Sequence, residues 1–390
     1  MIIAGESSGE LYGALLARSV RASFPDAEIT GIGGDRMADA GVKLMSRISS
    51  SFGIVEAIRT YRALRSTFRK AVDALATFAP QLIVLIDYPD FNMRLAAEAK
   101  KRGIKVLYYV SPQVWAWRQK RIYAISRTVD KMAVILPFEV EVYSETGLSC
   151  EFVGHPVMDE ILQTIGAEGF GLQDIGSAAL KACMKQKLGV DPNKPALTIM
   201  PGSRRHEISR LLPVLSQAVA ELKKRHPDYQ YIIPVAPNVD GTLFKGRALP
   251  EGCITIPGKS IEALAAADAG IIASGTSTLQ AAILGVPMAV VYKMSPLSIF
   301  IGRLIVKVKY ISLVNLLLEK SADGETGLRV KELIQEEASV ANIASEVSRL
   351  IDDAAYRNGM LLQLSKVRGL YEGRKASARV TEMIEELIRK

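Results

Sequence analysis

The sequence predicts an α/β protein made of two domains, each with a parallel sheet that faces a shared cleft. Short apolar runs alternate with segments of helical periodicity almost throughout the chain, which is the pattern of parallel α/β layers. With 390 residues, of which 49% are hydrophobic and 23% charged, the chain has a globular composition and is too long for one ordinary core.

The elements follow from these runs in order. In the first half we expect strands at Ile2–Ala4, Glu28–Ile32, Leu82–Ile86, Lys105–Tyr109, Lys131–Ile135 and Glu151–Val153. Helical segments are expected between them, at Leu11–Phe24, Arg94–Arg102 and Pro137–Glu145. In the second half we expect strands at Leu197–Met200, Tyr231–Pro234, Ile254–Ile256, Gly270–Ala273 and Met288–Val291.

The boundary between the domains is expected after Gly154-His155-Pro156, because a stretch rich in glycine and small residues follows at Gln163–Ser177. Residues 1–160 then form the first domain and residues 178–365 the second. Residues 366–390 form a charged, helical tail, and the C-terminal helices are expected to pack back toward the first domain.

The composition of the chain limits which partners it is expected to bind and in which cellular compartment it is expected to act. The 49 Lys and Arg residues against 41 Asp and Glu give a net charge of +8, which favours phosphates, an acidic membrane surface or nucleic acid. Three scattered cysteines without a C-x-x-C pair argue for a reducing compartment and against a zinc site. The sequence shows no signal peptide and no apolar run long enough to span a membrane, so we expect a cytoplasmic protein.

Two common nucleotide-binding fingerprints are incomplete. Gly31-Ile32-Gly33 begins like a dinucleotide motif, but Arg36 occupies the position of the third glycine. Pro257-Gly258-Lys259-Ser260 resembles the end of a Walker A loop, but the first glycine would fall at Cys253. We expect Ser260 to cap the following helix instead.

A loop after the strand at Leu197–Met200 has the composition of a phosphate site. Gly202 and Ser203 expose backbone N–H groups in a strand-to-helix turn, and the guanidinium of Arg204 can bind phosphate oxygens. A plain turn with solvated arginines explains this loop equally well when it is taken alone.

A second loop favours the phosphate-site interpretation over a plain turn. Ser274, Gly275 and Thr276 follow the strand at Gly270–Ala273 and open a helix, where the helix dipole and free N–H groups favour an anion of diphosphate size. A helix cap would need only one of the hydroxyl groups in this loop. Two such loops in one domain favour a nucleotide-activated sugar as the ligand.

In the first half, Asp87 ends a buried strand, where its carboxylate faces the crevice as a general base would. The alternative role is that of a helix cap, but Asp90 is better placed for it because it immediately precedes the helical run. The loop at Gly5–Glu10 faces the same crevice and either contacts sugar or phosphate or forms a tight turn. Its candidate acceptor-binding residues are Glu6, Ser7, Ser8 and Gly9.

Both tryptophans, Trp115 and Trp117, lie in one segment with three cations close behind, the first of which is Arg118. Core packing is the commoner fate of tryptophan. Two tryptophans next to cations just past a strand end also suit a phosphorylated amphiphile or a sugar face. Trp117 and Arg118 are therefore candidate acceptor-binding residues.

These motifs and their order resemble those of the lipid-A-disaccharide synthase family. Its members are GT-B-type glycosyltransferases with two Rossmann-like domains. The resemblance covers most of the chain, and the tryptophan segment is its most specific part. The matching segments are Gly5–Gly9, Ile86–Asn92, Val110–Arg118, Leu136–Glu139, Phe152–Pro156, Pro201–Arg204, Ala273–Thr276 and Tyr310–Asn315.

The resemblance implies that UDP-2,3-diacylglucosamine donates its sugar to the 6-hydroxyl of 2,3-diacylglucosamine 1-phosphate (lipid X), giving a β-1′,6 disaccharide and UDP. Asp87 would act as the base of an inverting displacement that needs no metal or other cofactor. The expected UDP-binding residues are Gly202, Ser203, Arg204, Ser274, Gly275, Thr276, Gln280 and Asn315.

Two positions depart from the family pattern. Glu10 stands where the family usually has Asp, and Gln280 stands where it usually has a Glu that contacts ribose in related enzymes. A neutral amide still hydrogen bonds two hydroxyl groups, so we expect UDP binding to survive in weaker form.

Acylated substrates imply contact with an anionic inner-membrane surface. A first candidate is a helical face with flanking arginines, made of Ile54, Ile58, Tyr61, Leu64, Phe68, Arg59, Arg62, Arg65 and Arg69. A second is Leu297–Tyr310, with Arg303, Lys307 and Lys309. For either helix alone, a core face with solvated charges is the commoner explanation. Both together in a basic protein favour membrane contact.

Other hypotheses have less support. A UDP-sugar 2-epimerase or a peptidoglycan-type transferase would share the fold, but the tryptophan segment counts against both. A non-enzymatic nucleic-acid-binding protein has only the net charge in its favour, so nucleic acid is not expected as a partner. The sequence leaves open whether the chain forms a homodimer.

Overall fold

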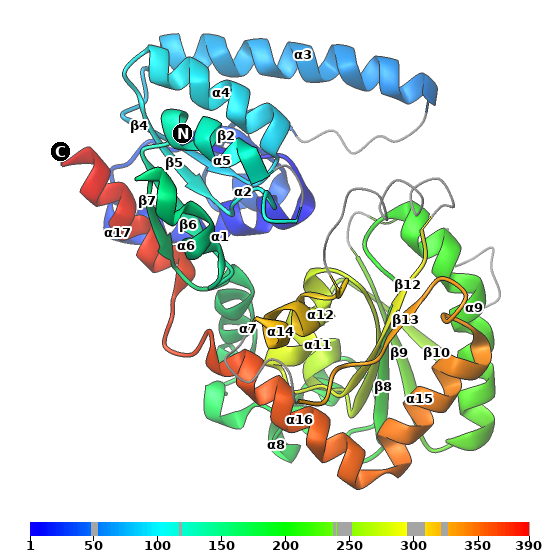
Figure 1. Cartoon of the computed structure of the whole chain (residues 1–390). Coiled ribbons are helices and arrows are strands. Elements are labelled where there is room, and N and C mark those ends of the chain that lie inside the picture. The colour runs from blue at the N-terminus through cyan, green and yellow to red at the C-terminus, as the bar shows by residue number, and fades with distance from the viewer. Residues whose placement is uncertain are drawn as a thin grey trace. The chain divides into compact units, whose positions relative to one another are not determined.

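The computed structural model describes residues 1–47, 54–116, 119–236, 239, 252–294, 309–320 and 327–389. The chain divides into two compact units, labelled by element in Figure 1. The first unit comprises Met1–Asp159 and Gly373–Lys390, and the second comprises Glu160–Glu372. Each unit contains one parallel sheet covered by helices, which confirms the predicted fold class.

Within the described residues, the first unit has a seven-stranded sheet in the order β3-β2-β1-β4-β5-β6-β7. All neighbouring pairs are parallel. The strands are β1 (Ile2–Ala4), β2 (Thr30–Gly33), β3 (Lys43–Arg47), β4 (Leu82–Ile86), β5 (Lys105–Tyr109), β6 (Lys131–Val134) and β7 (Ser149–Phe152). Their helices are α1 (Ser7–Ser23), α2 (Asp35–Asp39), α3 (Ile54–Thr77), α4 (Pro89–Lys101), α5 (Ile122–Thr128), α6 (Glu139–Tyr143) and α17 (Ala376–Ile388).

The second unit has a six-stranded parallel sheet in the order β10-β9-β8-β11-β12-β13. The strands are β8 (Ala196–Met200), β9 (Gln230–Val235), β10 (Cys253–Pro257), β11 (Ala269–Ala273), β12 (Met288–Tyr292) and β13 (Glu332–Ile334). Its described helices are α8 (Ala178–Lys187), α9 (Arg205–Arg225), α11 (Ser260–Ala265), α12 (Thr276–Ile283), α14 (Leu313–Glu319), α15 (Val340–Asp352) and α16 (Ala354–Gly369). Helix α7 (Pro156–Gly166) crosses from the first unit into the second.

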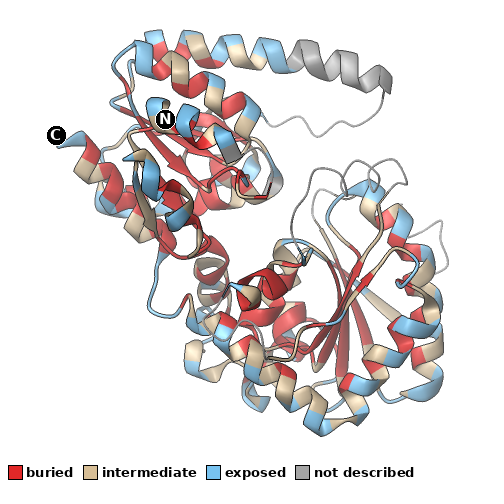
Figure 2. Cartoon of the chain, in the orientation of Figure 1, coloured by how far each residue is buried: buried red, intermediate tan, exposed pale blue. Residues whose placement is uncertain are grey.

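The central strands are buried on both faces, as their uninterrupted apolar runs require. Every residue of β4, β8 and β11 is buried, and Figure 2 shows the two sheets as the buried centre of their units. The edge strands β3 and β13 are only partly buried, and β13 has only three residues; the apolar pattern of the sequence did not indicate them. None of the described helices is both long and apolar enough to cross a membrane.

The C-terminal helix α17 belongs to the first unit, where it packs against α1 and covers part of the sheet. The guanidinium of Arg379 pairs with Glu151 at the end of β7 at 2.5 Å, and the amide of Ser377 donates to Asp159 at 2.8 Å. The predicted return of the C-terminal helix to the first part of the chain therefore has specific polar contacts as well as apolar packing.

Two expected local roles differ from the structure. Ser260 is the first residue of α11 and not its cap, because the capping position is taken by Lys259 in a left-handed conformation (φ 52°) without a side-chain cap. The glycines of Gly31-Ile32-Gly33 serve close packing: a Cβ at Gly31 would collide with the carbonyl oxygen of Ile2, and one at Gly33 with Met37.

The crowding at Gly31 gives a stability prediction. Gly31→Ala would force β1 and β2 apart, and we expect the free energy of unfolding to fall by at least about 2 kcal/mol, measured by urea denaturation. Gly166→Ala is the matched control, because a Cβ there meets no heavy atom within 4 Å. Equal stability of the two variants would show that the strand contact at Gly31 can relax.

Candidate functional site

In each unit the candidate residues follow the two strands between which the strand order reverses. In the first sheet β1 and β4 are neighbours, and they lead into the loop at Gly5–Glu10 and into Asp87. In the second sheet β8 and β11 are neighbours, and they lead into Pro201–Arg204 and Ser274–Thr276. The carboxyl edge at such a reversal is where open parallel sheets bind ligands. Each unit therefore holds its two predicted loops side by side at its binding edge.

The backbone of Asp87 is held in an uncommon conformation. Asp87 and Tyr88 both lie in the left-handed region, with φ 49° and 50°. The carbonyl of Asp87 accepts hydrogen bonds from Asn92 Nδ2 and from the hydroxyl of Tyr108, both at 2.7 Å, and its amide donates to Tyr109 at 3.1 Å. Residues without a glycine's freedom take this conformation only where surrounding contacts impose it, and such positions cluster at functional sites. The turn aims a half-buried carboxylate from the end of β4.

The expected cap of α4 is wrong. The helix begins at Pro89, with Tyr88 in the capping position and no side-chain cap. Asp90 therefore lies in the first helical turn, where its carboxylate pairs with Arg121 at 2.9 Å on the surface. The side chain of neither aspartate caps this helix.

The loop after β1 packs against the same turn. A Cβ at Gly5 would collide with the ring of Tyr88, so the two segments touch. Burial raises the pKa of Tyr88, and the nearby charge of Glu6 raises it further. Glu6 is exposed, Ser8 is half-buried and Gly9 is buried in α1, whereas the side chain of Ser7 lies outside the described part. Of the predicted set, only the exposed Glu6 has a recorded effect on this turn, through its charge on Tyr88.

The carboxylate of Glu10 has a local structural role. Its carboxylate accepts the backbone N–H of Arg36 at 2.9 Å and so satisfies a free amide in the first turn of α2. The half-buried carboxylate of Glu10 therefore stabilises the first turn of α2.

The tryptophan segment is anchored to α6. Trp115 is half-buried, its Nε1–H donates to Glu139 Oε1 at 3.1 Å, and its ring packs edge-on against Phe138 with centroids 5.1 Å apart. Trp117 and Arg118, the predicted acceptor residues, lie outside the described residues. Glu139 itself is only 2% exposed, and burial raises its pKa from 4.5 to about 8. The sequence motif included Glu139 but did not reveal that this carboxyl group is buried.

In the second unit, the loop after β8 already holds an anionic group. The backbone N–H groups of Ser203 and Arg204 donate to Glu207 Oε2 at 3.3 and 3.2 Å, and Arg204 Nη1 lies 3.3 Å from the other carboxylate oxygen. Gly202 is left-handed (φ 112°) and lets the loop turn toward this carboxylate. The amides of this loop and Arg204 therefore bind the carboxylate of Glu207, and half of the Arg204 side chain is exposed.

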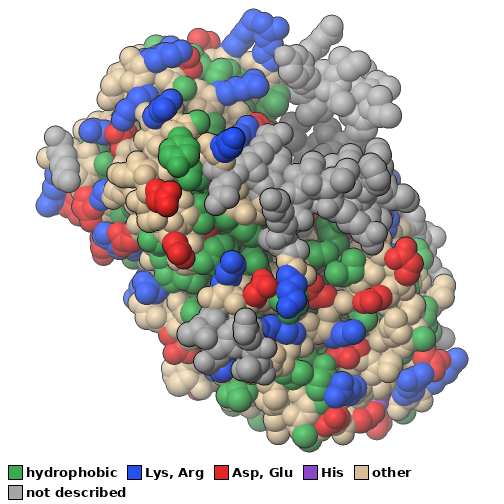
Figure 3. Space-filling view, viewed as in Figure 1, with side chains coloured by type: hydrophobic (Ala, Val, Ile, Leu, Met, Phe, Trp, Pro, Cys, Tyr) green, Lys and Arg blue, Asp and Glu red, His purple; other side chains and the backbone are tan. Residues whose placement is uncertain are grey.

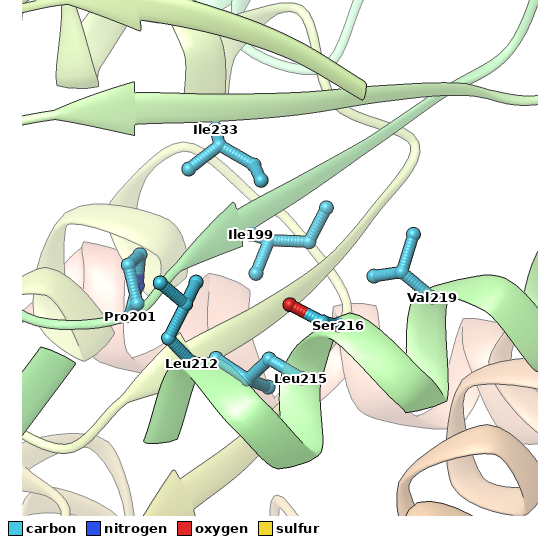
Figure 4. A pocket seen from close by; sticks show the side chains of 7 residues that line it. All are labelled: Ile199, Pro201, Leu212, Leu215, Ser216, Val219 and Ile233. Atoms are coloured by element: carbon cyan, nitrogen blue, oxygen red, sulfur yellow. The ribbon is translucent and has the colours of Figure 1, made fainter. Parts of the chain in front are cut away.

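Apolar packing supports this loop from below. Figure 4 shows Pro201 together with side chains of β8, β9 and α9, which surround a void of about 10 Å³. Such a space is too small for a ligand and is lined almost entirely by apolar groups. The void is a packing defect of the core. Pro201, at the start of the loop, lines it together with Ile199, Leu212 and Leu215.

The loop after β11 is more open. Gly275 takes the capping position of α12 at φ 148°. Within the described part of the chain, no side chain caps this helix and no heavy atom lies within 4 Å of a Cβ placed at Gly275. Among the described residues, the first amides of α12 therefore have no side-chain cap, as an anion site requires. Ser274 donates from Oγ to the carbonyl of Ile311 at 3.1 Å, which ties the loop to the segment before α14.

Two predicted UDP-binding residues make internal contacts. Gln280 donates from Nε2 to Glu160 at 3.0 Å, so part of its amide is engaged within the second unit. Asn315 is fully buried: its Nδ2 donates to the carbonyl of Val330 at 2.8 Å and to Glu332 at 2.9 Å, and its Oδ1 accepts from the amide of Val330 at 3.0 Å. The Asn315 side chain therefore joins α14 to Val330 and Glu332.

Glu332 organises that region from β13. Its carboxylate accepts the amides of Ile311 and Ser312 at 3.0 and 3.1 Å and the hydroxyl of Ser312 at 2.6 Å. Since Ile311 is also the partner of Ser274, Glu332 fixes the position of the segment beside the second anion loop. No periodicity or motif in the sequence indicated this carboxylate.

A larger cavity in the second unit, of about 910 Å³, lies at the opposite edge of the sheet. It is lined by Pro195 and Pro287, which precede β8 and β12, and by Lys181, Lys185 and Asp268. The two lysines pair with Asp268 at 2.7 and 3.3 Å. Because the cavity lies at the amino ends of the strands, it is separate from the candidate loops.

Comparison with known proteins identifies relatives over the whole chain. A model of the family described as lipid-A-disaccharide synthetase matches residues 1–381. The lipid-A-disaccharide synthase of Trichlorobacter lovleyi is 40% identical over 396 residues, covering 100% of this chain and 97% of that protein. That of Geobacter sulfurreducens is 38% identical, with the same two coverages.

Solved structures share the fold at low identity. A UDP-GlcNAc 2-epimerase from Neisseria meningitidis bound to UDP-GlcNAc has a TM-score of 0.61 at 13% identity and is covered over 99% of both chains. The calicheamicin glycosyltransferase CalG4 has a TM-score of 0.61 at 15% identity, covering 100% of this chain and 97% of the other. Identities this low show the fold alone. The sequence relatives go further, and by them the chain belongs to the lipid-A-disaccharide synthase family of glycosyltransferases.

Proposed function

We propose that this chain transfers the sugar of UDP-2,3-diacylglucosamine to the 6-hydroxyl of 2,3-diacylglucosamine 1-phosphate. The acceptor oxygen forms a bond to the anomeric carbon as the bond between that carbon and UDP breaks, giving a β-1′,6 disaccharide 1-phosphate and UDP. The observation that carries the proposal is the placement of an anion-binding loop pair and a carboxylate at the switch points of two sheets, in a member of this family.

The second unit binds the donor. The diphosphate of UDP lies on the amides that open α12 and on the guanidinium of Arg204, because both supply positive charge at the carboxyl edge of β8 and β11. The carboxylate of Glu207 accepts hydrogen bonds from the amides of this loop. A phosphate group at the loop must therefore displace Glu207 or bind beside it through Arg204. Gln280 retains its Oε1 as an acceptor for a ribose hydroxyl while its Nε2 binds Glu160.

The first unit supplies the base. Asp87 takes the proton of the acceptor hydroxyl as that oxygen attacks, which avoids a positively charged ether oxygen in the transition state. Charge that develops on the leaving UDP is stabilised by Arg204 and by the N–H groups of the second loop. These groups supply the charge that a metal ion often supplies in such reactions, so the proposal includes no metal or other cofactor.

We further propose that the protein acts at the inner face of the cytoplasmic membrane, because both substrates carry acyl chains. In α3, Leu64 is 37% exposed and Arg65 and Arg69 are exposed beside it. Phe68, which we assigned to the same membrane face, instead packs edge-on against Phe91 in the core, with centroids 5.4 Å apart. The side chains of residues 54–63 and the segment at 297–308 lie outside the described part.

The charge pattern does not favour nucleic acid. On the face shown in Figure 3, Lys and Arg side chains are interspersed with Asp and Glu among the described residues. A nucleic-acid-binding protein usually gathers its cations on one face or along one helix.

The proposed reaction is tested by mass spectrometry of the products. Incubation with both acylated substrates should yield a product whose mass is the sum of the two substrates minus UDP. Conversion of UDP-N-acetylglucosamine alone to its 2-epimer, with no disaccharide from the acylated pair, would replace the proposal by an epimerase.

Substitution of the base should separate chemistry from folding. Asp87→Asn keeps a residue that tolerates the left-handed region but removes the base, so we expect turnover to fall at least ~100-fold. Asp90→Asn, two positions outside the turn, is the matched control and should keep turnover within about threefold. A near-normal rate for Asp87→Asn would remove this residue from the base role.

Membrane contact is tested by co-sedimentation with vesicles of phosphatidylglycerol and phosphatidylcholine at low salt. Arg65→Glu combined with Arg69→Glu should weaken binding roughly tenfold or more, since each cation near an anionic surface contributes about 1 kcal/mol. Lys224→Glu combined with Lys366→Glu, at exposed positions of the second unit, should bind like the unsubstituted protein. Equal loss in both variants would indicate a general charge effect.

A further inference from the structure

The proposed reaction does not use the cavity of about 910 Å³ in the second unit. This cavity lies at the amino ends of β8, β11 and β12, where Pro195, Asp268 and Pro287 line it, whereas the candidate loops follow the carboxyl ends of β8 and β11. Helices α8 and α16 contribute its other main walls, at the same end of the unit (Figure 1). Its volume is that of a small-molecule site, so the chemistry of its lining decides what it can bind.

The lining of this cavity is basic. Its charged side chains are five cations and one carboxylate: Lys181, Lys185, Lys194, Arg357, Arg368 and Asp268. Three leucines line it as well: Leu350, Leu361 and Leu362. Cations gathered in a hollow with apolar walls raise the local concentration of anions. The lining therefore suits an anion with an apolar part.

Two of the lysines share the single carboxylate. The ammonium groups of Lys181 and Lys185 lie 2.7 and 3.3 Å from the two oxygens of Asp268. Burial raises the pKa of Asp268, but the charges of both lysines and the hydrogen bonds from Lys181 and from the amide of Ala196 lower it by more. The carboxylate is therefore ionised at neutral pH. Because it balances only one ammonium group, the three side chains together keep a net positive charge.

Lys185 is sufficient as the structural partner of this carboxylate. Its side chain is 7% exposed, and its ammonium group also donates to the carbonyl of Lys194 at 2.7 Å. A buried carboxylate needs one such cation. The side chain of Lys181 is 25% exposed and adds a second charge that the buried pair does not require. Lys181 is therefore the ammonium group with charge to offer a ligand.

The other cations have few anionic partners. Among the described residues, neither Lys194 nor Arg357 forms an ion pair, and Arg357 donates only to the carbonyls of Leu350 and Ile351, at 3.3 and 2.7 Å. The buried Nε of Arg368 forms no hydrogen bond within the described part of the chain, although Glu372 lies 3.5 Å from it. The cavity thus holds donors whose charge is not balanced by acidic groups.

Helix α16 presents charged and apolar groups to the cavity on one face. Arg357, Leu361, Ser365 and Arg368 follow one another at intervals of four, four and three residues, which places them along one side of the helix. The two arginines are about 16 Å apart along the helix axis at 1.5 Å per residue. Leu362, also in the lining, is 60% exposed. Apolar surface therefore lies between two cationic ends.

We propose that this cavity is a second ligand site of the chain, which binds a phosphate-bearing molecule through Lys181, Lys194 and the arginines of α16. A phosphate group carries up to two negative charges and accepts several charge-assisted hydrogen bonds, which ammonium and guanidinium groups supply. The leucines contact the apolar part of the same molecule. The phosphate belongs to a free small molecule or to a lipid headgroup. Because the site lies at the opposite edge of the sheet from the donor loops, it does not depend on the proposed transfer reaction.

Calorimetric titration of inorganic pyrophosphate tests this site, with UDP present at saturation to occupy the donor loops. We expect a Kd below about 1 mM at low salt, because several charge-assisted hydrogen bonds are available. Lys181→Gln combined with Lys194→Gln should raise this Kd about tenfold or more. The variant keeps the pair of Lys185 and Asp268. Its affinity for UDP alone should stay within about twofold of that of the unsubstituted protein, which shows that the unit is folded.

Lys101→Gln combined with Lys224→Gln is the matched control. The acidic partners of these exposed lysines keep a second cation, as Asp268 does: Glu98 keeps Arg102 at 2.7 Å and Glu221 keeps Arg225 at 3.0 Å. This control removes the same charge and should bind pyrophosphate within about twofold of the unsubstituted protein. An equal loss in both variants would show an effect of net charge and would overturn the proposal.

Co-sedimentation with phosphatidylcholine vesicles that contain phosphatidic acid distinguishes the two sources of phosphate. If the cavity variant loses pyrophosphate binding alone, the ligand is a soluble phosphate. If it binds these vesicles more weakly than the control variant does, the ligand is a lipid headgroup. The proposal is wrong if neither probe distinguishes the cavity variant from the control. A chain that fails to bind UDP would contradict the proposed function, whereas the comparison of the two variants would still decide this inference.

Discussion

The reversal of strand order within each parallel sheet is the constraint on which the candidate site depends. Between β1 and β4 in the first unit, and between β8 and β11 in the second, the connecting helices pass to opposite sides, so the loops that follow these strands have no crossing helix between them. Four loops with polar or strained residues follow these four strands. The chemistry of the chain is therefore concentrated where the topology leaves the sheet edge open.

The turn after β4 shows how the fold maintains a costly conformation at that edge. Two successive left-handed residues, Asp87 and Tyr88, cost roughly 1–2 kcal/mol each. Asn92 offsets part of this cost, because its fully buried amide donates to the carbonyls of both Ile86 and Asp87, and Tyr108 donates a further bond to Asp87. Net contributions of about 1 kcal/mol for each such bond are of the right size. Packing of Tyr88 against Gly5 completes the support and joins the two loops of the first unit.

The second unit uses acidic side chains to organise basic and amide groups. Glu207 gathers the loop amides beside Arg204, and Glu332 gathers the amides beside Ser274. Both carboxylates keep N–H groups oriented before a ligand arrives, which reduces the ordering cost of binding. They also compete with an anionic ligand for positive charge. Among the described residues, the half-exposed side chain of Arg204 and the first amides of α12 are the groups that we propose to bind it.

Apolar runs in the sequence predicted the central strands to within one or two residues, because burial on both faces demands unbroken hydrophobic stretches. The edge strands β3 and β13 were not predicted, because they are partly exposed and so carry no such run. The four loops were predictable from glycine and hydroxyl residues after strands. The roles of Asp90, Glu139 and Asn315 were not, because each depends on a contact with a residue far away in the sequence: Arg121, Trp115 and Val330.

Calorimetric titration of UDP into two variants tests most directly whether the second unit binds the donor while the first unit supplies the base. The account predicts that Arg204→Ala weakens UDP binding about tenfold or more, because it removes a charge-assisted contact to the diphosphate. It predicts that Asp87→Asn binds UDP within about twofold of the unsubstituted protein, since the base lies on the other unit. Unchanged UDP affinity in Arg204→Ala, or a large loss in Asp87→Asn, would contradict the assignment of donor binding to the loops of the second unit.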